Sequence, residues 1–137
     1  MKVSIKSIRH YLLFHPAHLF LLDGVGALIT GGTLFCVARW YPTALGLPPN
    51  LLAILGRVAF VYAVYSMTCY LVRPRNTRLF LRFIAVANLV YCLLMLLAVI
   101  YHFQRMTIPG LVYFFVEDVV VVCLVYVELT ISPMQKN

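Results

Sequence analysis

The four acidic residues of this 137-residue chain are Asp23, Glu117, Asp118 and Glu128, and each lies within a long run of apolar residues. A carboxylate placed in hydrocarbon costs about 2.5–3.5 kcal/mol on membrane-insertion scales. Such a group is therefore expected to face the interior of a helix bundle, where it can find a partner. The adjacent pair Glu117 and Asp118 could hold helices together, or it could bind a proton or a cation.

Arg57 is the one basic residue of eleven that falls well inside an apolar run. At 1.5 Å per residue it lies roughly 9 Å from the outer end of its run, and the acid pair lies roughly 12–14 Å deep from the same side. We therefore predict that Arg57 contacts Glu117 or Asp118. Adjacent residues point about 100° apart around a helix, so the second acid needs a hydroxyl, a water molecule or a proton.

Further polar residues fall at suitable depths to join this intramembrane network. Asn88 lies at the middle of its run and can bridge helices. Other candidates carry hydroxyl groups: Tyr62, Tyr65, Ser66, Thr68 and Tyr91. Asp23 comes early in the first run and Glu128 late in the last, so both are predicted to be acids of the inner rim.

The composition tells which kind of fold must position these groups. Hydrophobic residues make up 64% of the chain and charged residues 11%, whereas a soluble domain is about 45–50% apolar and about 25% charged. A soluble fold of this length cannot hide so much apolar surface. The composition therefore predicts an integral membrane protein and excludes a soluble enzyme, a disordered chain and a disulfide-stapled secreted module.

The prolines mark the ends of the membrane-spanning segments, because proline breaks a helix but is tolerated in its first turn. A spanning helix needs about 20 apolar residues. The predicted spans cover residues 17–39, 51–72, 79–101 and 109–130, which form one all-α bundle over residues 1–137. The basic segment 1–15 is predicted either as a short interfacial helix or as a loosely ordered tail.

The basic residues gather on one side of the predicted membrane. Eight lie in the N-terminal segment, around the loop between the second and third spans, and in the C-terminal tail, against two in the other loops. Because Lys and Arg remain in the cytoplasm, both termini are predicted there, in a cytoplasmic (inner) membrane. The net charge of +7 thus needs no nucleic acid, and the lipid bilayer is the expected partner.

The cysteines and histidines give no sign of a cofactor. The four cysteines lie in four different spans without a C-x-x-C pair, and none of the four histidines lies in the middle of a span. A thiol redox centre needs a close cysteine pair, and a membrane haem needs histidines that face each other. No cofactor, metal site or catalytic residue is predicted.

The size of the chain, its four spans and Asp23 in the first of them resemble the architecture of the small multidrug resistance exporters. The residues around Asp23 do not match the pattern of that family. The last helix of the family's members also carries no acid pair like Glu117 and Asp118. The resemblance therefore implies the architecture alone.

Three functions fit these observations. The leading hypothesis is a non-enzymatic membrane protein that acts by assembly, as a subunit or small scaffold. The second is a dimeric proton- or cation-coupled carrier or channel that uses the intramembrane acids, and the third is a lipid-ligand pocket or lipid-modifying enzyme. The small residues Ala27 and Gly31 fit either packing within one bundle or a homodimer seam.

The cavity at the acids would distinguish these functions. A filled core with every acid paired favours assembly. A water-connected cavity favours transport, and a dry pocket that ends at the acids favours a ligand.

The charge bias gives a first prediction, on topology. Reporter fusions at the C-terminus and within the loop 73–82 should report the cytoplasm, and a fusion within the loop 41–50 should report the outer side. The opposite pattern would overturn the orientation and every comparison of depth that rests on it.

Overall fold

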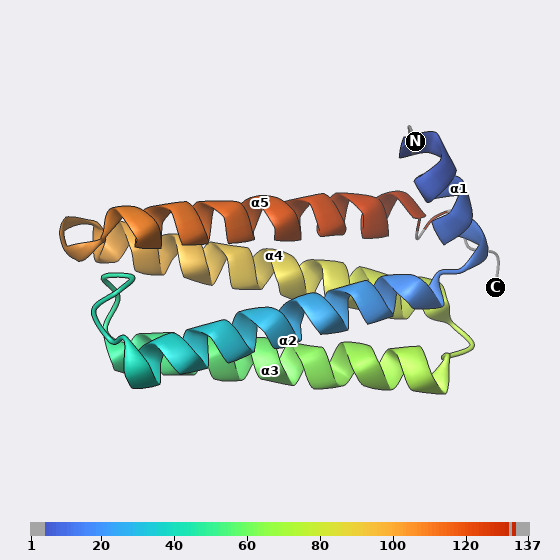
Figure 1. Ribbon diagram of the computed structural model, residues 1–137. Coiled ribbons are helices and arrows are strands. Elements are labelled where there is room, and N and C mark those ends of the chain that lie inside the picture. Colours follow the sequence, from blue (N-terminus) through green and yellow to red (C-terminus); the bar gives the residue numbers. More distant parts are fainter. Residues whose placement is uncertain (1–4, 132, 134–137) are drawn as a thin grey trace.

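The computed structural model describes residues 5–131 and 133, and in this part of the chain all regular secondary structure is helical (Figure 1). The helices in chain order are α1 (Ile5–Phe14), α2 (Ala17–Trp40), α3 (Pro49–Val72), α4 (Thr77–Tyr101), the short 3₁₀ helix η1 (Phe103–Arg105) and α5 (Ile108–Ile131). The helices α2 to α5 are long and apolar enough to cross a membrane. The prediction of four long apolar helices in an all-helical chain is therefore confirmed, with ends that differ by at most two residues.

The segment before the first span forms the helix α1, which corresponds to the helical alternative predicted for it. Residues 1–4 of that segment lie outside the described residues. In Figure 1, α1 stands at an angle to the four long helices, at the end of the bundle where α2 begins.

The four long helices form two pairs. Helix α2 packs chiefly on α3, and α4 packs chiefly on α5, whereas contacts between the pairs are sparse (Figure 1). The helices of each pair are consecutive in the chain, so each pair is a helical hairpin. The seam between the hairpins is therefore the least tightly packed part of the bundle.

Two glycines account for the close packing of α2 on α3. A Cβ atom built on Gly31 would lie 3.0 Å from the carbonyl oxygen of Gly56, and one built on Gly56 would lie 3.2 Å from the carbonyl oxygen of Gly31. Small residues let two helix backbones approach in this way. Gly31, one of the small residues of the first span, thus contacts α3 within the bundle.

A loop closes one end of the seam. The hydroxyl of Thr107 donates a hydrogen bond to the carbonyl oxygen of Ala44 (2.6 Å) and accepts one from the backbone N–H of Gly110 (3.0 Å). Gly110 leaves room for the loop, because a Cβ atom there would lie 2.0 Å from the carbonyl oxygen of Leu45. The α2–α3 loop is therefore fixed against the start of α5.

Two apolar clusters fill the bundle and leave a polar layer between them. The cluster at the loop end contains Leu34, Leu45, Leu47, Leu52, Leu55, Ala59, Tyr91, Met95 and Phe114. The other contains Leu19, Phe20, Cys69, Leu81, Ile84 and Ile131. The buried polar residues Asp23, Ser66 and Asn88 fall between these sets on α2, α3 and α4.

The glycine contact gives the second prediction. Replacing Gly31→Leu should destabilise the bundle by more than about 1–3 kcal/mol, the usual cost of overpacking, because its backbone contact with Gly56 leaves no space. The matched control is Gly32→Leu, because a Cβ atom on the exposed Gly32 meets nothing within 4 Å. Thermal unfolding in detergent measures both, and equal midpoints for the two variants would contradict the assigned role of Gly31.

Candidate functional site

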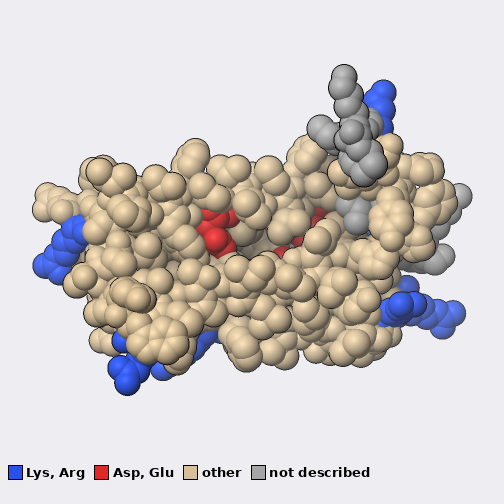
Figure 2. All heavy atoms as spheres, viewed as in Figure 1, with Lys and Arg blue, Asp and Glu red and all other residues tan. Residues whose placement is uncertain are grey.

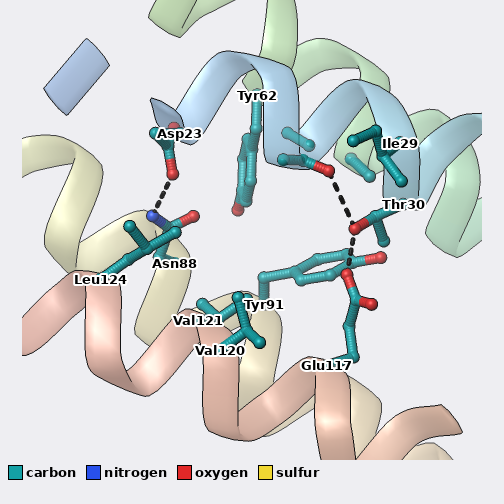
Figure 3. A pocket seen from close by; sticks show the side chains of 13 residues that line it. Asp23, Ile29, Thr30, Tyr62, Asn88, Tyr91, Glu117, Val120, Val121 and Leu124 are labelled. Atoms are coloured by element: carbon teal, nitrogen blue, oxygen red, sulfur yellow. Dashed lines mark hydrogen bonds between the residues drawn. The ribbon is translucent and has the colours of Figure 1, made fainter. Parts of the chain in front are cut away.

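A cavity of about 220 Å³ lies between the two hairpins, with α2 on one side and α5 on the other (Figure 3). All four long helices contribute to its lining: Asp23, Gly26, Ala27, Ile29, Thr30, Ala59, Tyr62, Asn88, Tyr91, Glu117, Val120, Val121 and Leu124. This lining contains two carboxyl groups and no Lys or Arg. The cavity therefore has an uncompensated acidic character within an otherwise apolar bundle.

Asp23 forms one end of the cavity and is almost completely buried, with 4% of its surface exposed. The Nδ2 atom of Asn88 donates a hydrogen bond to its Oδ1 atom at 2.6 Å (Figure 3). The hydroxyl of Ser66 donates a hydrogen bond to its Oδ2 atom. Asp23 thereby connects α2 to α3 and to α4.

Glu128 from α5 completes this group, which we call the Asp23 cluster: Asp23, Ser66, Asn88 and Glu128. Its side chain is only 1% exposed, and its Oε2 atom has no hydrogen-bond partner. The carboxyl group of Asp23 and the amide of Asn88 are its polar neighbours. The cluster thus joins all four long helices.

Glu117 forms the other end of the cavity, where Thr30 faces it across the seam (Figure 3). The hydroxyl of Thr30 makes two contacts, one with Oε1 of Glu117 and one with the carbonyl oxygen of Gly26 at 3.1 Å. A hydroxyl carries a single proton. It can donate that proton to one of the two oxygen atoms or share it between them, so Thr30 links α2 to Glu117 on α5.

Aromatic side chains form part of the wall between the two acidic ends. The rings of Tyr62 and Tyr91 meet edge to face, with centroids 5.9 Å apart. The hydroxyl of Tyr91 donates a hydrogen bond to the carbonyl oxygen of Leu55 at 3.2 Å, which anchors that ring to α3. The cavity therefore combines carboxyl groups with aromatic faces, a combination that suits a positively charged group.

Asp118 lies outside this cavity, although it follows Glu117 directly. It lines a separate groove on α4 and α5 with Val99 and Phe114, and its Oδ1 atom has no hydrogen-bond partner. Its polar neighbour is Cys92. The two acids of the predicted pair thus point into different environments.

Arg57 does not form the predicted contact. Its side chain is exposed and lines a groove on the outer face of α2 and α3, beside Gly31 and Gly56, and no ion pair with Glu117 or Asp118 occurs among the described residues. The reason is the direction of its side chain. Arg57 lies on the outer face of the α2–α3 hairpin, whereas Glu117 faces the cavity between the two hairpins.

The structure brings together Asp23, Asn88 and Glu117 at one cavity and Glu128 beside it, whereas Arg57 and Asp118 lie elsewhere. The two acids expected at the inner rim, Asp23 and Glu128, are both buried.

Among the hydroxyl candidates, Ser66, Tyr62 and Tyr91 lie at the site, while Thr68 bonds its own helix at Val64. Thr30 was not predicted as part of the network. It lies seven positions after Asp23, a spacing that returns to the same helix face.

Fold and site together define an all-helical bundle with four helices able to span a membrane and a carboxyl-lined cavity between two hairpins. No protein-family model, no curated protein and no solved structure matches this chain. The chemistry of the cavity is therefore the feature of this chain that bears on its function.

The different surroundings of Asn88 and Arg57 give the third prediction. Asn88→Leu should destabilise the bundle by about 1–3 kcal/mol, because it leaves a buried oxygen of Asp23 without its donor. Arg57→Gln should change the stability by less than about 0.5 kcal/mol, as is usual for an exposed side chain. Chemical or thermal unfolding in detergent measures both variants. A larger loss for Arg57→Gln than for Asn88→Leu would restore the predicted ion pair.

Proposed function

We propose that this chain is a multi-pass membrane protein that binds the positively charged headgroup of an amphiphile in the cavity between α2 and α5. The supporting observation is the lining of the cavity, in which Asp23 and Glu117 place carboxyl groups at the two ends and no basic residue neutralises them. A buried charge needs a partner. A cation that enters the cavity can supply that partner to Asp23 or Glu117.

The size of the cavity limits what can bind. Its volume of about 220 Å³ exceeds the roughly 150 Å³ of an apolar cavity that holds benzene. It is below the roughly 300–1,000 Å³ of pockets that hold drug-sized ligands. A small ammonium headgroup fits, whereas a whole lipid does not. The acyl or alkyl chain of the ligand then remains in the bilayer.

The opening of the cavity supports entry from the lipid. Figure 2 shows acidic side chains at the bottom of a hollow on the side of the bundle, between α5 and α2. The surface around the hollow is tan, and its basic residues lie toward the ends of the bundle. A ligand dissolved in the bilayer would reach the carboxyl groups without crossing a layer of charge.

The location of the protein follows from its sequence rather than from the cavity. We place it in the cytoplasmic (inner) membrane with both termini in the cytoplasm, because eight basic residues lie on that side and two on the other. The bilayer is then its immediate partner and the source of the ligand.

An open cavity favours a ligand over the assembly hypothesis, which expects a filled core with every acid paired. Asp118 and Glu128 each have an oxygen atom without a hydrogen-bond partner, so the condition that every acid is paired is not met within this chain. The carrier hypothesis shares the same binding site and adds movement of the bound cation across the membrane. Binding is therefore the property to test first.

The fourth prediction uses the two adjacent acids of α5 as a matched pair. Dodecyltrimethylammonium should bind to the wild-type protein in lipid nanodiscs, and Glu117→Gln should weaken binding at least tenfold, the equivalent of about 1.4 kcal/mol. Asp118→Asn should leave the affinity unchanged, because Asp118 does not line the cavity. Titration followed by the thermal midpoint or by radiolabelled probe gives the affinities.

Uncharged dodecanol serves as the control for nonspecific partition. Equal affinities of the wild type and Glu117→Gln for the cation would end the proposal, as would binding of dodecanol as tight as that of the cation. Binding that depends on Glu117, followed by flux of the probe into liposomes, would extend it to a carrier.

A further inference from the structure

The Asp23 cluster contains two carboxyl groups that are almost completely buried within the bundle. Asp23 is 4% exposed and Glu128 is 1% exposed, and both interact with the amide of Asn88 and lie within electrostatic range of one another. The polar groups around them are the hydroxyl of Ser66 and the amide of Asn88, and the other titratable groups at the adjoining cavity are Tyr62, Tyr91 and Glu117. No Lys or Arg side chain forms an ion pair with either acid among the described residues.

The two carboxyl groups differ in the hydrogen bonds that their oxygen atoms accept. Both oxygen atoms of Asp23 accept a hydrogen bond, one from Asn88 and one from Ser66. The Oε2 atom of Glu128 accepts none. Donors aimed at both oxygen atoms stabilise a carboxylate, whereas a buried oxygen without a donor is costly for a charged group and tolerable for an acid that carries a proton.

Two adjacent carboxylates in a dry site repel each other, and a single proton removes one of the two charges. We infer that Asp23 and Glu128 form a one-proton site within the bundle, in which Glu128 holds the proton and Asp23 holds the negative charge.

The donors also determine which cation the site accepts. A sodium ion needs oxygen lone pairs pointed at it. The Asn88 amide instead points its Nδ2 atom at Asp23, and Ser66 directs its O–H at the same carboxyl group. This arrangement suits an anion that accepts hydrogen bonds. The positive charge that balances the second carboxyl group is therefore a proton.

The route of the proton follows from which residues line the cavities. Asp23 and Asn88 line the cavity of about 220 Å³ and also a second cavity of about 130 Å³ on the α3–α4 side. Glu128 lines neither cavity. A proton that leaves Glu128 must therefore pass to Asp23: the O–H bond of Glu128 breaks, an O–H bond forms on Asp23, and the negative charge moves to Glu128.

The small number of acids makes a direct test feasible, because the chain has only two Glu and two Asp residues. In Glu117→Gln protein made with glutamate that is ¹³C-labelled at the carboxyl carbon, Glu128 is the only labelled acid. In Asp118→Asn protein made with carboxyl-labelled aspartate, Asp23 is the only one. Infrared spectra of each protein in nanodiscs at neutral pH then report the protonation of one residue at a time.

The expected result is a protonated carboxyl band from labelled Glu128 and a carboxylate band from labelled Asp23. Two carboxylate bands would overturn the inference, and so would two protonated bands or a proton on Asp23 alone. No amphiphile is present in this experiment. Its failure is therefore independent of the proposed binding of a cation at Glu117.

Stability gives a second, independent measurement. Glu128→Gln should lower the thermal midpoint by less than about 3 °C, because an amide resembles the protonated acid. Asp23→Asn should lower it by roughly 5 °C or more, because the new NH₂ group would face the donor of Ser66 or Asn88. The opposite order would place the proton on Asp23 and contradict the assignment. A midpoint that rises in sodium chloride relative to choline chloride, in the wild type but not in Glu128→Gln, would identify a sodium site instead.

Discussion

The buried carboxyl group of Asp23 holds the interior of this bundle together. It accepts hydrogen bonds from Ser66 on α3 and Asn88 on α4, and it lies against Glu128 on α5. A carboxyl group in hydrocarbon must be satisfied within the protein, so the depth and rotation of α2 relative to its neighbours are constrained by this one side chain. The cavity exists because the hairpins meet at these polar contacts and not along a continuous apolar interface.

The two hairpins differ from the seam between them in how closely they pack. Gly31 and Gly56 bring α2 and α3 into backbone contact, and the loop contact of Thr107 with Ala44 fixes the hairpins together at one end. Between this closed end and the second apolar cluster, the carboxyl groups of Asp23 and Glu117 line the space that remains. The cavity in this bundle is thus found where the close packing of the helices ends.

Much of the fold could be predicted from the sequence, because a bilayer imposes one length on every span and the prolines mark where spans end. The burial of Asp23 and Glu128 agrees with the expectation that charge in hydrocarbon turns inward, whereas Glu117 and Asp118 are half-buried. The partners of the acids could not be predicted, because the depth of a residue along a helix does not give the direction of its side chain around the helix. Arg57 has a suitable depth for Glu117, yet it lies exposed on the outer face of the α2–α3 hairpin. Thr30 lies on the same helix face as Asp23, but it is uncharged, so its position in hydrocarbon does not by itself require a partner.

The distribution of polar partners between the hairpins has a consequence for biosynthesis. The Asp23 carboxyl group and its Ser66 donor belong to α2 and α3, while Asn88 and Glu128, like Cys92 and Asp118, are neighbours within α4 and α5. Helices leave the ribosome in chain order, so each acid of these three sets enters the membrane in the same hairpin as its first polar neighbour. Only Glu117, whose partner Thr30 is in the earlier hairpin, has to wait for the second half of the chain to dock. The contacts that bound the cavity at its two ends, Thr30 with Glu117 and Asn88 with Asp23, then form together when the hairpins dock.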